Sequence, residues 1–279
     1  MEKFEKYSVL ECVYAKEDPS FFAKSLESIV TQSLPPDQFV IVLDGPLTDE
    51  LNKIVHDYEI KYHGMIDILP LKENVGPGRA AHKGFAICRN EIVARMDSDD
   101  ISCPDRMRLE LERINEGFDV VGGAIIEFNE SIDKPLYTKY QPQSHDEIVK
   151  MSKKRNPINH VTIMYKKSMV LSVGGYNTFR LGEDYSLVIS LIQAGARCSN
   201  IQQPAVCVRV GEGQISRRSG KMLRQNLRAL RKHMYQTAYI SWWQYKFYSL
   251  ETDLFTLQPA CMKRWMYKHV LRKRKAKNE

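Results

Sequence analysis

Three aspartates stand within four positions directly behind a short apolar run. The run covers residues 91–96, and the acids are Asp97, Asp99 and Asp100. Asp97 and Asp99 are two residues apart, so in an extended chain their carboxylates point to the same side. Oxygen donors without nitrogen or sulfur ligands suit a hard divalent cation such as Mn²⁺ or Mg²⁺. A metal held by so few protein groups keeps room for phosphate oxygens, so it would neutralise a departing diphosphate.

A second interpretation of the acidic run is purely structural. The same residues could form an Asx-rich turn that caps a helix beginning near Pro104. A fourth acid favours binding instead, because Asp44 also follows an apolar run, at 39–43. In open parallel sheets, ligands bind outside the carboxyl ends of the strands.

The elements that would position these acids alternate through the first hundred residues. Asp18 and Pro19 are a good helix start, and Phe22, Leu26 and Ile29 behind them have helical spacing. Alternation of strands and helices implies crossover connections, hence an α/β fold with a mostly parallel sheet. The predicted strands lie at 7–14, 39–43, 65–71 and 91–97.

Beyond residue 100 the alternation loosens, and from about residue 217 the pattern is helical and separate. We therefore expect one domain at 1–216, with halves at 1–100 and 101–216, and a basic helical extension at 217–279.

Composition excludes several classes of protein. The chain has 279 residues, of which 43% are hydrophobic and 27% charged, as in a globular enzyme or binding domain. No run approaches the roughly 18 apolar residues of a membrane span. The start lacks a long apolar stretch, so we expect no signal peptide. Six cysteines without C-x-x-C spacing favour reduced, cytoplasmic thiols over a zinc site.

The net charge of +7 is concentrated near the end of the chain. Residues 263–278 hold eight Lys or Arg and no acid. They could form a solvated tail. Trp265 and Tyr267 offer apolar anchors among the cations, which favours contact with an anionic membrane surface. No recognition motif accompanies the charge, so we expect no nucleic-acid partner.

Four segments in order resemble the family 2 glycosyltransferases of the GT-A fold. The first segment has strands that end in V-Y and D-G, with S-L-E-S-I and Q-S-L-P-P between them. The other three segments are N-V-G, the D-x-D of M-D-S-D-D and the E-D of L-G-E-D-Y. The resemblance covers roughly 7–210 and is strongest toward bacterial amylovoran, capsule and O-antigen enzymes. It implies a Rossmann-like, mostly parallel sheet flanked by helices, with a nucleotide-binding half at 1–100 and an acceptor-side half at 101–216.

The resemblance also assigns roles on the donor side. Asp44 would accept from a uracil ring, Arg79 would lie near a phosphate, and Asp99 would hold the metal beside Asp97. The residues expected to border a UDP-sugar are Cys12, Val13, Tyr14, Glu17, Asp44, Asn74, Gly76, Arg79, Asp97 and Ser98.

On the acceptor side, the resemblance makes Asp184 the base that takes a proton from the attacking hydroxyl. A helix start at this position would favour its ionised form. Glu183 and His160 would face the acceptor. Without the resemblance, the E-D pair could also be a plain helix cap, and a lone His160 on a predicted strand is more often a structural residue.

Two departures from the family pattern matter. The common V-D-D-G-S is L-D-G-P-L here, with Leu43 in place of an acid, which puts ribose or base contacts there in doubt. Processive members carry Q-x-x-R-W, whereas residues 214–218 read Q-I-S-R-R. Arg218 in place of Trp favours transfer of a single sugar.

We therefore expect an inverting, metal-dependent transferase, cytoplasmic and peripheral on the inner face of the membrane. It would move one hexose, galactose or glucose, from a UDP-sugar to a lipid-diphosphate-linked saccharide in bacterial surface-polysaccharide assembly. One alternative is an inactive relative that binds nucleotide sugars. The other is an NAD-dependent dehydrogenase, because G-P-G-R-A-A fits G-x-G-x-x-A. Pro77 between the glycines, and two earlier strand–helix units, count against it.

Overall fold

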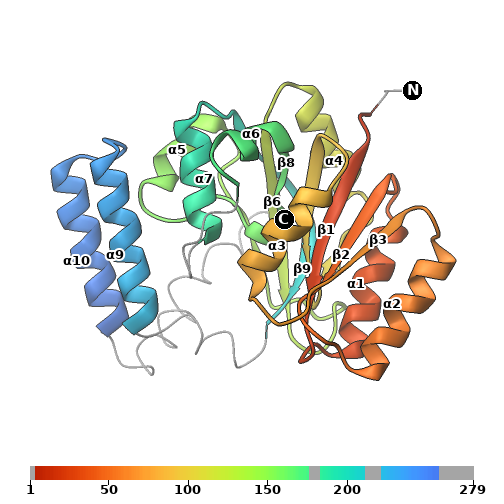
Figure 1. The fold of residues 1–279 in the computed structure, drawn as a ribbon. Coiled ribbons are helices and arrows are strands. Elements are labelled where there is room, and N and C mark those ends of the chain that lie inside the picture. The colour runs from red at the N-terminus through yellow and green to blue at the C-terminus, as the bar shows by residue number, and fades with distance from the viewer. Residues whose placement is uncertain (1–3, 176–182, 211–220, 258–279) are drawn as a thin grey trace. The chain divides into compact units, whose positions relative to one another are not determined.

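The computed structural model describes residues 4–175, 183–210 and 221–257 (Figure 1). The chain divides into two compact units, and each is described by itself. The larger unit contains 4–175 and 183–210, and the smaller contains 221–257. No helix within these ranges has both the length and the apolar character that crossing a bilayer requires. The predicted boundary at residue 216 lies outside the described residues.

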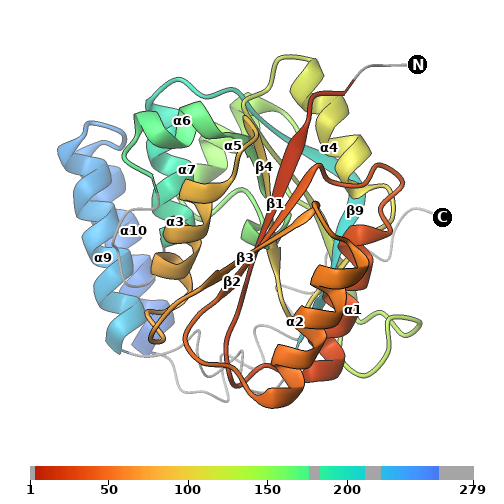
Figure 2. The ribbon, with the colours of Figure 1, turned by 45° about the vertical axis from the view of Figure 1, so that its right-hand side comes forward.

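The first half of the larger unit is a parallel sheet with crossover helices, as predicted. Its strands pair in the order β3-β2-β1-β4. Helices α1 and α2 cover one face of this sheet and α3 covers the other (Figure 2). The strands are β1 (Tyr7–Val13), β2 (Gln38–Leu43), β3 (Ile66–Pro70) and β4 (Ile92–Asp97). The helices are α1 (Pro19–Val30), α2 (Asp49–Lys61) and α3 (Pro77–Ile87).

The second half extends the same sheet. Strand β8 lies antiparallel between β4 and β6, β9 runs parallel to β6, and β5 and β7 pair antiparallel with β9 and β6. The strands are β5 (Ile101–Ser102), β6 (Val120–Phe128), β7 (Tyr137–Lys139), β8 (Met164–Lys166) and β9 (Cys198–Arg209). The helices are α4 (Arg106–Asn115), α5 (His145–Ser152), the 3₁₀ helix η1 (His160–Thr162), α6 (Lys167–Ser172) and α7 (Glu183–Gln193).

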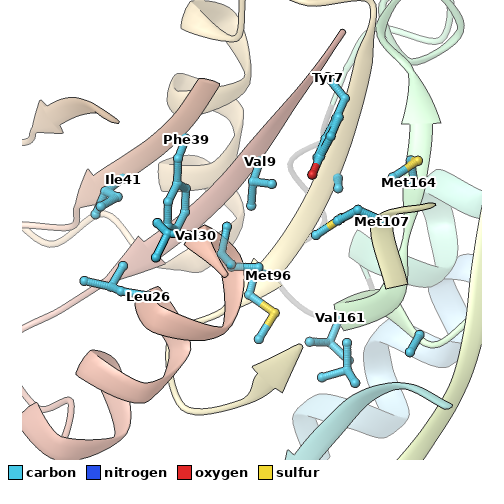
Figure 3. Close-up of a cluster of buried hydrophobic side chains, with 14 of the residues drawn as sticks. Tyr7, Val9, Leu26, Val30, Phe39, Ile41, Met96, Met107, Val161 and Met164 are labelled. Atoms are coloured by element: carbon cyan, nitrogen blue, oxygen red, sulfur yellow. The ribbon is translucent and has the colours of Figure 1, made fainter. Parts of the chain in front are cut away.

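Helix α1 begins and packs as its sequence predicts. The Asp18 side chain accepts hydrogen bonds from the backbone N–H groups of Ser20 and Phe21, which caps the helix. Leu26 and Val30 lie against Phe39 of the sheet (Figure 3). Burying each such side chain contributes about 1.5–3 kcal/mol, so this core holds β1 and β2 in place.

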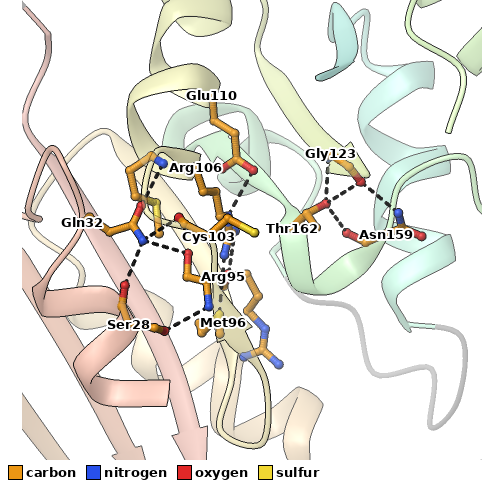
Figure 4. Close-up of polar contacts among 12 residues, drawn as sticks. Ser28, Gln32, Arg95, Met96, Cys103, Arg106, Glu110, Gly123, Asn159 and Thr162 are labelled. Carbon is orange, nitrogen blue, oxygen red and sulfur yellow. Dashed lines mark hydrogen bonds and ion pairs between the residues drawn. The ribbon is translucent and has the colours of Figure 1, made fainter. Parts of the chain in front are cut away.

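A buried arginine of α4 connects this helix to β4. The Arg106 guanidinium lies 3.1 Å from the Glu110 carboxylate and donates to the Arg95 carbonyl at 2.8 Å (Figure 4). Both side chains of the pair are fully buried. Burial raises the pKa of Glu110 to about 7, although Arg106 acts to lower it. Glu110 thus holds Arg106, and Arg106 contacts the strand that ends at Asp97.

Replacing Arg106 by Met is expected to lower the free energy of unfolding by about 3–5 kcal/mol, because Glu110 stays buried without its partner. The folded-state pKa of Glu110 then rises further, so the loss should be smaller near pH 5 than near pH 8. The double variant R106M/E110L should recover most of the stability. Urea unfolding measures all three proteins, and an R106M variant as stable as the original would contradict this account.

The smaller unit is a pair of packed helices, α9 (Lys221–Gln236) and α10 (Trp242–Leu257). Arg224 and Arg228 pair with Asp253, and Arg231 donates to the Thr252 hydroxyl at 3.1 Å. The expected helical character of this region is confirmed.

Candidate active site

The carboxyl ends of β1, β2 and β4 lie side by side. In the strand register, Cys12 is opposite Asp97 and Val13 is opposite Leu43. Parallel pairing therefore gathers the predicted nucleotide residues at one edge of the sheet. The Val13 side chain is an exception, because it lies in the core and only its carbonyl, which accepts from the Asp44 N–H at 2.8 Å, faces the edge.

Asp97 meets a positive charge within its own strand. Its Oδ1 lies 3.3 Å from Nη2 of Arg95, which is buried and also contacts the Cys12 sulfur at 3.6 Å. Arg95 and Asp97 are two residues apart on β4, so both point to the same side of the sheet. The Asp97 side chain keeps 41% of its surface exposed, so a ligand can still reach it.

Asp99 and Asp100 differ in their burial. Asp100 is buried and accepts the backbone N–H of Arg209 at 2.8 Å, while its own N–H donates to the Asp97 carbonyl at 3.2 Å. Burial raises its pKa well above the usual range, with Asp99 and Asp97 adding to the effect. Asp99 stays half-exposed. The acidic run does form a turn, but α4 begins only at Arg106, so the run does not cap that helix.

Two partly exposed carboxylates, Asp97 and Asp99, lie at this edge of the sheet. Within 4–175, 183–210 and 221–257, no group of three or more His, Cys, Asp or Glu side chains could hold a metal. Asp97 and Asp99 are both partly exposed and supply only oxygen atoms. These donors fit a hard divalent ion that completes its coordination with water and phosphate oxygens.

Asp44 organises the loop that precedes α3. Its carboxylate is buried and accepts the backbone N–H groups of Val75 at 2.7 Å and Gly76 at 3.1 Å. The Asn74 side chain donates to the Asp44 carbonyl at 3.1 Å. Gly45 has φ 86°, and a Cβ there would lie 2.6 Å from the Asn74 nitrogen. The structure thus brings Asp44, Asn74 and Gly76 together, and the predicted contact of Asp44 with a uracil ring stays a prediction.

The remaining donor-side residues surround this loop and the end of β1. Tyr14 is exposed, and half-buried Glu17 accepts a hydrogen bond from the Ser98 hydroxyl at 2.6 Å. Arg79 is exposed in the first turn of α3, whose N-terminus has no side-chain cap. Free N–H groups and a cation at a helix start suit a phosphate.

Asp184 and His160 reach the region of Asp97 from the second half. Asp184, in the first turn of α7, accepts from the Asn156 amide at 3.1 Å. Burial lowers the pKa of His160 and so does the charge of Arg95, whereas Asp184 and Asp97 act to raise it. Arg95, Asp184 and Asp97 are therefore close enough to His160 for their charges to act on its pKa. The strand predicted in this segment is present as β8, but His160 lies before it in η1, so its predicted place on the strand is wrong.

Three predicted features fall outside the described residues. The side chain of Glu183, at the start of α7, is one of them. The Q-I-S-R-R segment at 214–218 and the basic segment at 263–278 are the others.

The sequence itself identifies the family. Residues 8–171 match the profile described as Glycosyl transferase family 2. The chain belongs to glycosyl transferase family 2. It is a glycosyltransferase, and the match spans the D-x-D and N-x-G segments described above.

Relatives within family 2 act in bacterial polysaccharide synthesis. The chain is 32% identical over 271 residues to the UDP-Gal:alpha-D-GlcNAc-diphosphoundecaprenol beta-1,3-galactosyltransferase of Escherichia coli, covering 96% of this chain and 97% of that protein. It is 33% identical over 218 residues to the amylovoran biosynthesis glycosyltransferase AmsE of Erwinia amylovora, covering 77% and 80%.

A solved family 2 structure has the same fold. TarS 1-349 of S. aureus, in complex with UDP-GlcNAc, aligns with a TM-score of 0.64 and 18% identity, over 82% of this chain and 66% of that chain. The predicted GT-A fold is confirmed, and the dehydrogenase alternative is wrong. Its G-x-G-x-x-A segment starts at Gly76, the N-cap of α3, and continues into the first turns of that helix.

Two buried charged residues of this glycosyltransferase site were not predicted. Arg95 is one, and the other is Glu11, which is fully buried in β1 with Ser25 3.1 Å away. The Ser25 hydroxyl also lies 3.2 Å from the Asp97 carbonyl. Burial raises the pKa of Glu11 to about 8. Both are charged residues within otherwise apolar strands, and this sequence pattern could have predicted them.

Proposed function

We propose that this glycosyltransferase moves one hexose from a UDP-sugar to a lipid-diphosphate-linked saccharide, with inversion at the anomeric carbon. The E. coli relative, which aligns along nearly its whole length, is named for UDP-galactose and a diphosphoundecaprenol-linked acceptor. The TarS structure holds UDP-GlcNAc. Galactose or glucose is the proposed sugar.

The donor would bind at the carboxyl edge of the sheet. The loop fixed by Asp44 and the cationic start of α3 would face the nucleotide and its phosphates. Asp97 and Asp99 would hold Mn²⁺ or Mg²⁺. Such an ion supplies Lewis-acid stabilisation to the departing diphosphate. No protonated carboxyl group is then needed on the leaving side.

Asp184 would be the base. The observation that supports this role is the place of Asp184 in the first turn of α7, where the Asn156 amide donates to its carboxylate at 3.1 Å. A base near the acid that borders the donor can take the proton of an acceptor hydroxyl as that hydroxyl attacks. Asn156 would orient the carboxylate, and His160 and Glu183 would line the acceptor side. Attack opposite the diphosphate turns an α-linked donor into a β-linked product.

The proposed domain at 1–216 would contain both halves of this site. The extension at 217–279 would keep the enzyme at the inner face of the cell membrane, where a lipid-linked acceptor lies. The basic composition of 263–278 supports contact with anionic lipids.

A donor screen tests the proposal. UDP release is measured for a panel of UDP-sugars with a GlcNAc-diphosphate-lipid acceptor, with Mn²⁺ present and after chelation. We expect one UDP-hexose to dominate, activity to need the ion, and the product to carry a single β-linked hexose. Equal UDP release with and without chelator would contradict the proposed metal requirement. Addition of more than one hexose to the acceptor would contradict transfer of a single sugar.

A further inference from the structure

The smaller unit carries an apolar stripe along one face of α10. Trp243, Phe247, Leu250 and Leu254 are 76%, 65%, 58% and 60% exposed. They follow one another at intervals of four, three and four residues, so they share one face of the helix. We call these four residues the α10 stripe.

The α10 stripe is not the face that packs on α9. Tyr248 and Thr252, on the opposite side of the helix, are buried. The Arg231 guanidinium from α9 lies 5.1 Å from the Tyr248 ring and donates to the Thr252 hydroxyl. Helix α10 therefore pairs with α9 through one face and directs its largest apolar side chains away from that contact.

The charge of this part of the chain is strongly positive. Residues 221–279 hold fourteen Lys or Arg and three acids, whereas residues 1–220 hold 27 and 31. Beside the stripe, the Lys246 ammonium lies 5.5 Å from the Trp242 ring. The Asp253 carboxylate is paired with two arginines of α9. A partner that covers the α10 stripe must therefore offer both an apolar region and negative charge.

We propose that the α10 stripe inserts into the interfacial region of an anionic lipid bilayer, with α10 lying along the surface. Trp, Phe and Leu side chains gain by entering the boundary of the acyl chains, while neighbouring cations contact the headgroups. A two-fold contact with a second copy would instead bring two strongly basic units together. The inference deepens the proposed membrane partner, and it does not depend on which sugar is transferred.

Vesicle binding of the full chain tests the α10 stripe. The double variant F247S/L250S should bind vesicles of phosphatidylglycerol and phosphatidylethanolamine roughly ten- to a hundredfold more weakly than the original protein. The matched control I60S/L171S changes two exposed residues of the larger unit, 64% and 57% exposed, and should bind as the original does. All three should melt at nearly the same temperature, because the replaced side chains are exposed.

Two further readouts complete the test. Tryptophan fluorescence of the original protein should shift to shorter wavelength on these vesicles, and binding should persist in part at about 1 M salt, where charge is screened. Binding that F247S/L250S leaves intact would overturn the inference. So would a dimer in solution that the double variant abolishes while vesicle binding is absent. UDP release with a water-soluble acceptor, measured on the same proteins, separates a failure of the proposed transferase activity from a failure of membrane binding.

Discussion

Asp184→Asn should lower kcat by about 10²- to 10⁴-fold, because the amide cannot take the proton of the acceptor hydroxyl. UDP affinity should stay nearly unchanged, since the proposed base faces the acceptor. The Asn156 amide, which donates to the carboxylate, can still donate to the oxygen of the new amide, so the fold should persist. Turnover kinetics and calorimetric UDP titration measure the two effects separately.

Asp146→Asn is the matched control. Asp146 is exposed and lies in the first turn of α5, as Asp184 lies in the first turn of α7. The control repeats the loss of one negative charge at a helix start, away from the site, and should leave kcat unchanged. Equal losses of turnover and UDP affinity in D184N would contradict the proposed role as base.

Asp99→Asn should reduce kcat/KM by about a hundredfold or more, because the proposed ion, which would stabilise the departing diphosphate, would lose a charged ligand. The same variant should bind UDP equally well with and without Mn²⁺, whereas the original protein should bind it more tightly with the ion. Titration of UDP in both conditions provides this readout independently of catalysis.

Asp57→Asn provides the comparison for this change. Asp57 is an exposed acid on α2, and the variant should keep both activity and metal-dependent UDP binding. If UDP binding by D99N depends on Mn²⁺ as strongly as it does in the original protein, the ion is held elsewhere.

Much of the first half of the larger unit could be predicted from local sequence. The predicted strands at 39–43 and 91–97 agree closely with β2 and β4. Buried parallel strands are short apolar runs bounded by turns, and the amphipathic helices between them have a clear period, so each element is specified by its own residues. The helix start at Asp18 is equally local.

The backbone conformation around His160 could not be predicted from local sequence in the same way. The apolar residues there suggested a strand, yet His160–Thr162 form the 3₁₀ helix η1. The Thr162 hydroxyl accepts the Gly123 N–H at 2.9 Å, and the Asn159 amide donates to the Gly123 carbonyl at 2.9 Å (Figure 4). These partners belong to β6, so the local backbone depends on a distant strand.

The sequence by itself determined that Asp97 and Asp99 stand at the end of one buried strand and that Asp44 follows another strand of the same parallel sheet. Local periodicity and chain order are sufficient for that. Only the tertiary structure decided that Asp100 turns inward to the Arg209 backbone, that Arg95 pairs with Asp97, and that Asn156 donates to Asp184. Contacts between groups far apart in the sequence depend on how the two halves pack. Burial at this edge also raises the pKa of Asp100, so its carboxyl group favours the neutral form more than it would in water.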